Sequence, residues 1–112
     1  MKKILVVADD FITLSEIKVH LEQEGYEVET ARNGKDALLM LDSFRADIII
    51  VDLIMPDMRG DQLINILWGR YPQLPVILIG NIIPDEHHAD RAITKPINFD
   101  VLNHTIKELL PE

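Results

Sequence analysis

Length, composition and charge restrict what this protein can be. The chain has 112 residues, 47% hydrophobic and 27% charged, as expected of a single globular domain over 1–112. Its 19 acidic and 11 basic residues give a net charge of -8, which argues against direct binding to nucleic acid or to an anionic membrane. The chain has no cysteine, which excludes disulfides and thiolate metal sites and suits a reducing, cytoplasmic location.

Short apolar runs alternate along the chain with longer segments of helical spacing. The runs 4–8, 48–51 and 76–79 predict buried central strands, and 26–30 alternates in polarity as a half-exposed outer strand does. Hydrophobic residues spaced three and four apart predict helices over about 12–24, 34–44, 60–71 and 98–110. The alternation predicts an α/β fold with an open, doubly wound, parallel sheet.

The segment between Gly80 and Lys95 is too short for an ordinary crossover. It holds 14 residues. The loops and helix of a crossover need about 10–12 residues, and the next strand must come from the same 14. We therefore expect the fourth helix to be short or missing, with at most about a turn and a half over 85–90. A very short fifth strand near 91–94 would then close the sheet.

Charged residues follow three of the predicted strands. Asp9 and Asp10 come after the first strand, Asp52 ends the third, and Lys95 follows the fifth. Because parallel strands end at the same edge of a sheet, these side chains should meet there. Neighbouring carboxylates repel by about 4 kcal/mol per pair at an effective dielectric near 20, which favours a bound divalent cation. A site of oxygen ligands alone favours Mg²⁺.

Three motifs in this order resemble the receiver domain of bacterial two-component response regulators. They are the pair Asp9-Asp10, Asp52 within the segment 48–57 followed by Gly60, and Thr94-Lys95-Pro96. The resemblance runs from 3 to 110 and implies a five-stranded, flavodoxin-like receiver fold. It also implies that Asp52 accepts a phosphoryl group from the phosphohistidine of a sensor histidine kinase or a phosphotransfer protein.

The resemblance implies a role for each residue of the site. Asp10 and Asp52 would bind Mg²⁺ directly, together with the backbone carbonyl of Ile54, and Asp9 would act mostly through bound water. Lys95 would pair with a phosphoryl oxygen, and its peptide bond to the following proline would be cis. Such a domain is not a conventional enzyme, but it assists its own phosphorylation and dephosphorylation.

Two positions depart from the family pattern. Gly80 lies where the family usually ends its fourth strand in Ser or Thr, and Ala92 lies where an aromatic residue usually swings inward on activation. The usual switch residues are therefore both absent, together with most of the helix that they move. The sequence leaves open the oligomeric state and how the domain would signal to a downstream protein or to an effector domain.

A second interpretation also remains open from the sequence. The chain could be a degenerate receiver-fold module that binds partners without being phosphorylated. The acids and Lys95 favour the phosphoacceptor, whereas Gly80, Ala92 and the short crossover favour the degenerate module. Flavin-binding and P-loop proteins are excluded, because the chain lacks the phosphate-binding loops that they need.

Other conspicuous residues have simpler interpretations. Adjacent His87 and His88 would not face a common ligand from a short helix, so we expect a solvated polar turn there. Trp68 is expected to serve packing, and Asp57 to be an ordinary acid of a loop.

Overall fold

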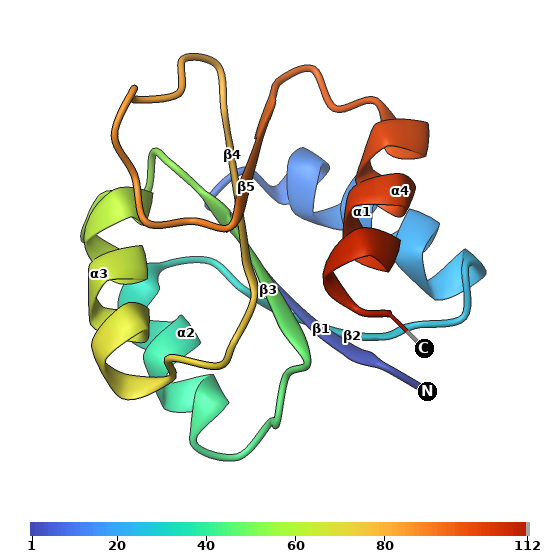
Figure 1. The fold of residues 1–112 in the computed structure, drawn as a ribbon, viewed down its shortest axis with the longest axis horizontal. Helices are drawn as coiled ribbons and strands as arrows, with labels where there is room; N and C mark the ends of the chain where they lie inside the picture. Colours follow the sequence, from blue (N-terminus) through green and yellow to red (C-terminus); the bar gives the residue numbers. More distant parts are fainter. Residues whose placement is uncertain (112) are drawn as a thin grey trace.

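The computed structural model describes residues 1–111 and confirms the doubly wound parallel sheet (Figure 1). The strands are β1 (Lys3–Val7), β2 (Glu27–Ala31), β3 (Ile48–Asp52), β4 (Val76–Gly80) and β5 (Arg91–Thr94). The helices are α1 (Phe11–Gln23), α2 (Gly34–Leu41), α3 (Gly60–Arg70) and α4 (Phe99–Leu109). The strands pair in parallel in the order β2-β1-β3-β4-β5.

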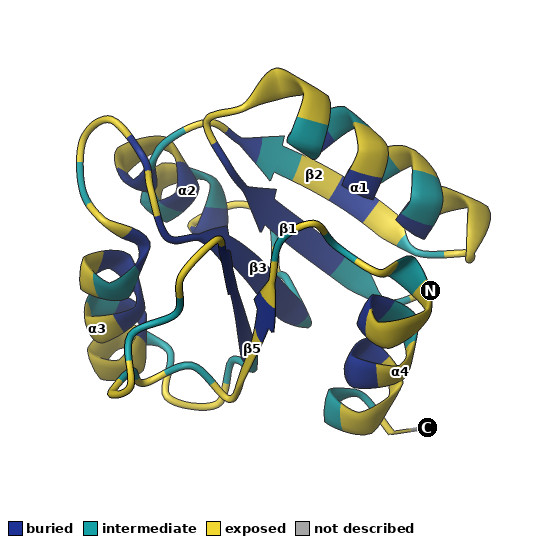
Figure 2. Ribbon diagram, turned by 90° about the horizontal axis from the view of Figure 1, so that it is seen from above, coloured by how far each residue is buried: buried dark blue, intermediate teal, exposed yellow. Residues whose placement is uncertain are grey.

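A separate hydrophobic core lies on each face of the sheet. Figure 1 shows α1 and α4 on one face and α2 and α3 on the other. Successive side chains of a strand point to opposite faces, so Ile4 and Val6 join the first core and Leu5 and Val7 join the second. Burial on both faces explains the continuous apolar runs of the central strands, which are dark blue in Figure 2.

Three of the four described helices begin at a side-chain cap, and the helices end within about three residues of the predicted positions. Asp10, Asn33 and Asn98 each accept backbone N–H groups at the start of α1, α2 and α4. The prediction for α2 was too long, because the helix ends at Leu41 instead of residue 44. Asp42 and Ser43 follow, and residues of these types favour turns over helix.

No helix lies between β4 and β5 in the described chain. The connecting segment, residues 81–90, is a loop, so the fourth helix is missing, which is one of the two outcomes that the sequence predicted, and residues 85–90 form no helical turn. Six residues give few helical hydrogen bonds for the cost of nucleation. Here Asp90 bonds to Val76 instead, with its carboxylate accepting the Val76 N–H at 2.8 Å and its own N–H donating to the Val76 carbonyl at 2.9 Å.

The connecting segment also contacts the core and α3. Ile83 and Ala89 pack against the core on the α2 and α3 side of the sheet. His88 hydrogen bonds to Asn65 at 2.6 Å through Nδ1 and packs against the exposed ring of Trp68, with 4.1 Å between ring centroids and the two rings tilted by 37°. His88 is exposed in this loop, as expected of a solvated polar segment, and it also contacts α3 through Asn65 and Trp68. In the part of the chain that the structure describes, no helix has the length and apolar character to cross a bilayer.

Asp57 links the loop after β3 to the start of α2. Its carboxylate accepts the backbone N–H groups of Gly34 at 3.0 Å and Lys35 at 2.9 Å. Desolvation raises the pKa of Asp57, but these backbone donors outweigh it, and the pKa lies below its ordinary value. Asp57 is therefore a long-range cap of α2 and not the ordinary loop acid that the sequence indicated.

We expect Asp57→Ala to lower the free energy of unfolding by about 0.5–1 kcal/mol near neutral pH, the low part of the range for a lost helix cap, because the site is exposed. Since the folded-state pKa of Asp57 is depressed, its stabilisation is present above the unfolded pKa and is lost as the pH falls through the folded value. Urea unfolding at neutral pH and at about pH 3 should therefore show that the difference in free energy of unfolding between the wild type and Asp57→Ala is smaller in acid. The control is Asp85→Ala, because Asp85 is exposed. A loss of unfolding free energy in Asp57→Ala that does not change with pH would contradict this role.

Candidate functional site

A buried carboxylate paired with a lysine lies at the carboxyl end of the central strands. Asp52 is the last residue of β3, and only 3% of its surface is exposed. Its Oδ2 accepts a hydrogen bond from Lys95 Nζ at 2.5 Å, and its Oδ1 receives a longer contact of 3.4 Å from the Ile54 N–H. Burial of an ionised carboxylate is costly unless it is paired, and Lys95 supplies that partner.

The backbone around Asp52 leaves no room for larger residues. Gly60, the first residue of α3, donates its N–H to the Leu53 carbonyl at 2.7 Å. A Cβ added to Gly60 would lie 2.3 Å from the backbone oxygen of Asp52. Gly60 therefore allows α3 to start directly beside the strand end that carries Asp52.

A backbone hydrogen bond fixes the position of Lys95. It follows β5 immediately, and its N–H donates to the Gly80 carbonyl at 2.9 Å. The Lys95–Pro96 peptide bond is cis, as the resemblance to receiver domains implied. Gly80 ends β4 and Ala92 lies exposed in β5, at the positions where the sequence placed the two absent switch residues.

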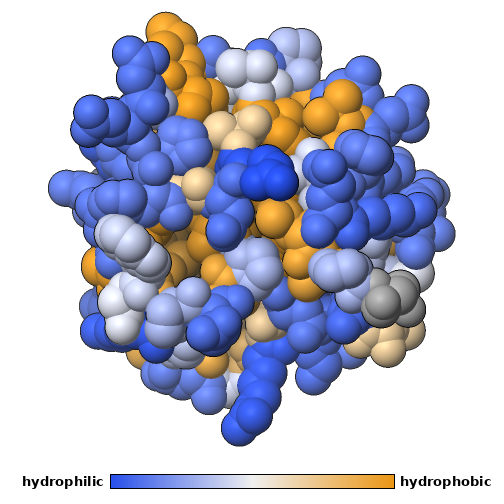
Figure 3. All heavy atoms as spheres, in the orientation of Figure 1, coloured by the Kyte–Doolittle hydropathy of each residue, from blue (hydrophilic) through white to orange (hydrophobic). Residues whose placement is uncertain are grey.

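An open pocket of about 560 Å³ surrounds the Asp52 carboxylate. Its lining residues come from the loops after β1, β3, β4 and β5: Asp9, Asp10, Asp52, Leu53, Ile54, Arg59, Asn81, Ile82, Pro84 and Lys95. Ile54 and Ile82 are exposed hydrophobic residues of this lining, and Figure 3 shows separate hydrophobic patches among hydrophilic residues at the upper edge, where these loops lie in Figure 1. The predicted site residues Asp9, Asp10, Asp52, Ile54 and Lys95 thus share one pocket.

Asp10 serves as the cap of α1 in this structure. Its Oδ2 accepts the Thr13 hydroxyl at 2.7 Å and its Oδ1 accepts the Ile12 N–H at 3.1 Å. The hydrogen bond from the Thr13 side chain is the largest cause that lowers the pKa of Asp10 below its ordinary value. Neighbouring Asp9 is exposed, and its backbone carbonyl accepts a hydrogen bond from Arg32 at 3.0 Å.

The donor chemistry of the pocket fits Mg²⁺, although its carboxylates are not drawn together. Within the described residues, no three acidic or histidine side chains are grouped closely enough to hold a metal ion. Asp10 is engaged with Thr13, and Asp52 is engaged with Lys95. The groups available are carboxylate oxygens and a backbone carbonyl, without sulfur or imidazole, as Mg²⁺ prefers.

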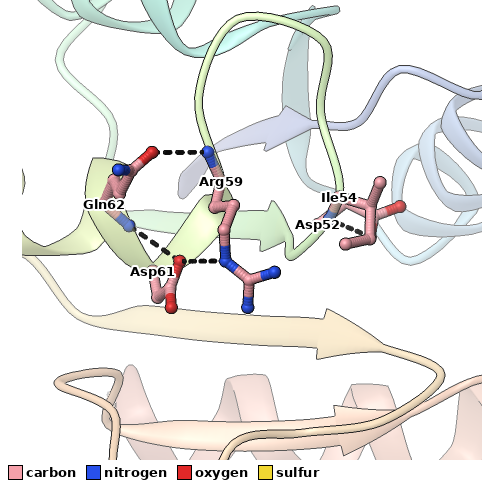
Figure 4. A network of polar contacts seen from close by, with 5 residues as sticks. All are labelled: Asp52, Ile54, Arg59, Asp61 and Gln62. Carbon is pink, nitrogen blue, oxygen red and sulfur yellow. Dashed lines mark hydrogen bonds and ion pairs between the residues drawn. The ribbon is translucent and has the colours of Figure 1, made fainter.

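The sequence interpretation missed one cation of the pocket. Arg59 precedes α3 and lines the same hollow as Asp52 and Lys95. Its Nε donates to Asp61 Oδ1 at 3.2 Å, and its backbone N–H donates to the Gln62 side chain at 2.9 Å (Figure 4). Its position seven residues after Asp52 and next to Gly60 was the available signal.

Comparison with known proteins agrees with this geometry. The family model of the response regulator receiver domain matches residues 4–107. The chain belongs to the response regulator receiver family. Among curated receiver proteins, it is 28% identical to the Bacillus subtilis alkaline phosphatase synthesis transcriptional regulatory protein PhoP, over 97% of this chain and 48% of that protein. It is 34% identical to the Escherichia coli transcriptional regulatory protein GlrR, over 97% of this chain and 26% of that protein.

Solved receiver structures share the whole fold. The Thermotoga maritima response regulator protein TrrA, in complex with Mg²⁺-BeF, superposes with a TM-score of 0.91 at 33% identity, over 97% of this chain and 99% of that chain. The Vibrio cholerae chemotaxis protein CheY4 has a TM-score of 0.91 at 29% identity, over 97% and 98% of the two chains. The present receiver spans about half the length of PhoP and about a quarter of that of GlrR.

Removing the Lys95 side chain should destabilise the protein, because Asp52 is buried. We expect Lys95→Met to lower the free energy of unfolding by about 1–2 kcal/mol, because the buried carboxylate loses its partner. Urea unfolding of Lys95→Met and of the exposed Lys107→Met measures this difference. The loss should be smaller when Lys95→Met is made in an Asp52→Asn background. Equal stability of the two single lysine variants would contradict the pairing.

Proposed function

We propose that this receiver, acting as one domain over 1–112, is a two-component phosphoacceptor and that Asp52 is the acceptor. The observation that carries the proposal is the buried Asp52 carboxylate, paired with Lys95 and facing a pocket that Asp9 and Asp10 also line. A buried, oriented carboxylate beside a cation meets the main needs of phosphoryl transfer, which are positioning and charge neutralisation.

The reaction transfers one phosphoryl group between two side chains. A carboxylate oxygen of Asp52 attacks the phosphorus of a phosphohistidine on a sensor histidine kinase or a phosphotransfer protein. The new O–P bond forms as the P–N bond breaks, and the imidazole leaves with the bonding electron pair and takes up a proton. Lys95 Nζ, which bonds to Asp52, would bind an oxygen of the transferred group.

Mg²⁺ would be held by Asp10, Asp52 and the Ile54 carbonyl, with Asp9 acting through water. When bound, it supplies positive charge against the phosphoryl oxygens. Asp10 bonds to Thr13 through one carboxylate oxygen and to the Ile12 N–H through the other. The complex of the similar receiver TrrA with Mg²⁺-BeF supports this choice of ion.

Phosphorylation would change how this receiver binds a downstream protein or an effector domain. The curated relatives are transcriptional regulators of greater length than this chain, which supports an effector as the recipient of the signal. Gly80 and Ala92 supply neither the hydroxyl nor the aromatic ring of the usual switch, so the output face differs from that of the family.

Incubation with Mg²⁺ and acetyl phosphate should add one phosphoryl group to the wild-type protein, measured by intact mass spectrometry. Asp52→Asn should abolish the adduct, because an amide is no nucleophile for phosphorus. Asp57→Asn is the matched control, since it lies in the same loop but bonds to the start of α2, and it should be modified like the wild type. A wild type without adduct, or an adduct on Asp52→Asn, would refute the proposed acceptor and leave the unphosphorylated module as the alternative.

We also expect the phosphoaspartate to decay slowly. Ile54 is 65% exposed and Ile82 is 82% exposed, and both line the pocket, so apolar side chains lie where an attacking water would need hydrogen-bond partners. Ile54→Asn should accelerate loss of the adduct several-fold, followed by intact mass after removal of the phosphodonor. The exposed Leu39→Asn of α2 serves as control, and decay of Ile54→Asn at the wild-type rate would contradict this prediction.

A further inference from the structure

Arg59 is a second cation in the pocket that holds Asp52. The loop after β3 brings it there, so that Asp52, Lys95 and Arg59 all line the same hollow. Its side chain is half exposed, with 51% of its surface accessible, whereas that of Lys95 is 22% accessible. Lys95 is thus committed to the buried carboxylate, and Arg59 lies on the open side of the pocket.

Among the described residues, the Arg59 side chain is bonded through Nε to Asp61. Its Nε donates to Asp61 Oδ1 at 3.2 Å, and Asp61 is itself fixed by accepting the Gln62 N–H at 3.1 Å. Figure 4 shows the two terminal nitrogens of Arg59 extending away from Asp61, with no bond to the other residues drawn. The Asp61 contact therefore restrains the guanidinium while its two terminal donors stay available to an anion.

Gly80 leaves the end of β4 without a side-chain donor. This residue ends β4 beside Asp52 and offers no side-chain hydroxyl. An incoming phosphodonor is an anion, and it must enter a pocket that the acids Asp9, Asp10 and Asp52 line. A guanidinium binds phosphate oxygens with two parallel hydrogen bonds, and it stays charged at every relevant pH.

We propose that Arg59 binds the phosphoryl oxygens of the phosphodonor and orients it toward Asp52. This inference rests on the proposed phosphoacceptor function and adds a residue that selects for dianionic donors. Arg59 acts before the transfer, when the donor enters the pocket, and Lys95 acts on the group once it reaches Asp52. Removing Arg59 should therefore slow capture of the donor and leave the carboxylate itself intact.

The test compares the second-order rate constant for phosphorylation by acetyl phosphate, with Mg²⁺, in the wild type and in Arg59→Ala. We expect Arg59→Ala to reduce this constant on the order of tenfold, as for the loss of a charge-assisted hydrogen bond. Arg59→Lys should recover part of the rate. Arg70→Ala removes an exposed arginine from the far end of α3, and it should behave as the wild type.

Two further readouts separate anion binding from a structural role. The rate constant of the wild type should fall more steeply with added salt than that of Arg59→Ala, because one attractive charge is missing from the variant. Phosphoramidate, which carries less negative charge than acetyl phosphate at neutral pH, should lose less rate on the substitution. The Arg59 backbone N–H bonds to Gln62 whatever the side chain, so α3 should keep its start, and urea unfolding checks this.

The outcomes distinguish this inference from the function on which it rests. A wild type that never becomes phosphorylated overturns both. A wild type that is phosphorylated at Asp52, with Arg59→Ala equally fast and equally salt-dependent, overturns the role of Arg59 and leaves the phosphoacceptor in place. If Arg59→Ala is poorly folded, Arg59→Gln repeats the comparison with a side chain of similar reach and no charge, and a rate equal to that of the wild type overturns the role in the same way.

Discussion

The ion pair between Asp52 and Lys95 is the contact on which the site depends, and it is a product of the sheet. β4 lies between β3 and β5, with Asp52 in register with Ile79 and Gly80 in register with Thr94. Lys95 therefore reaches across the end of β4 to a carboxylate 43 positions earlier in the chain. Since the paired strands are parallel, their ends meet at one edge, and the loops that leave this edge form the pocket.

The connection after β4 links the pocket at the sheet edge to α3. Residues 81–90 start at the pocket, where Asn81, Ile82 and Pro84 line it, and then reach α3, where His88 packs against Trp68. A loop in this place has fewer internal hydrogen bonds than a helix, and it is fixed by the contacts of its own side chains instead. In this receiver the connection between β4 and β5 is therefore a loop and not a helix.

The sequence predicted the sheet, the four helices of the described residues and the residues that line the pocket beside Asp52, because each depends on a local pattern or a short motif. Runs of apolar residues predicted β1, β3 and β4. The acids and Lys95 at the ends of strands indicated which edge of the sheet carries the site. The role of Asp57 could not be predicted in this way, because its partners Gly34 and Lys35 lie 23 and 22 positions away in the chain. The contact of Arg59 with the pocket and the packing of His88 against Trp68 likewise depend on how the loops fold over the finished sheet.

The most direct test of Asp52 as the phosphoacceptor is to locate the phosphoryl group in the chain. The phosphorylated protein can be reduced with borohydride, which converts an aspartyl phosphate to homoserine, and then cleaved after arginine. The peptide from Ala46 to Arg59 contains Asp47, Asp52 and Asp57, so two acids serve as internal controls. Homoserine at Asp52 alone is the predicted result, and homoserine at Asp47 or Asp57, or at none of the three, would contradict it.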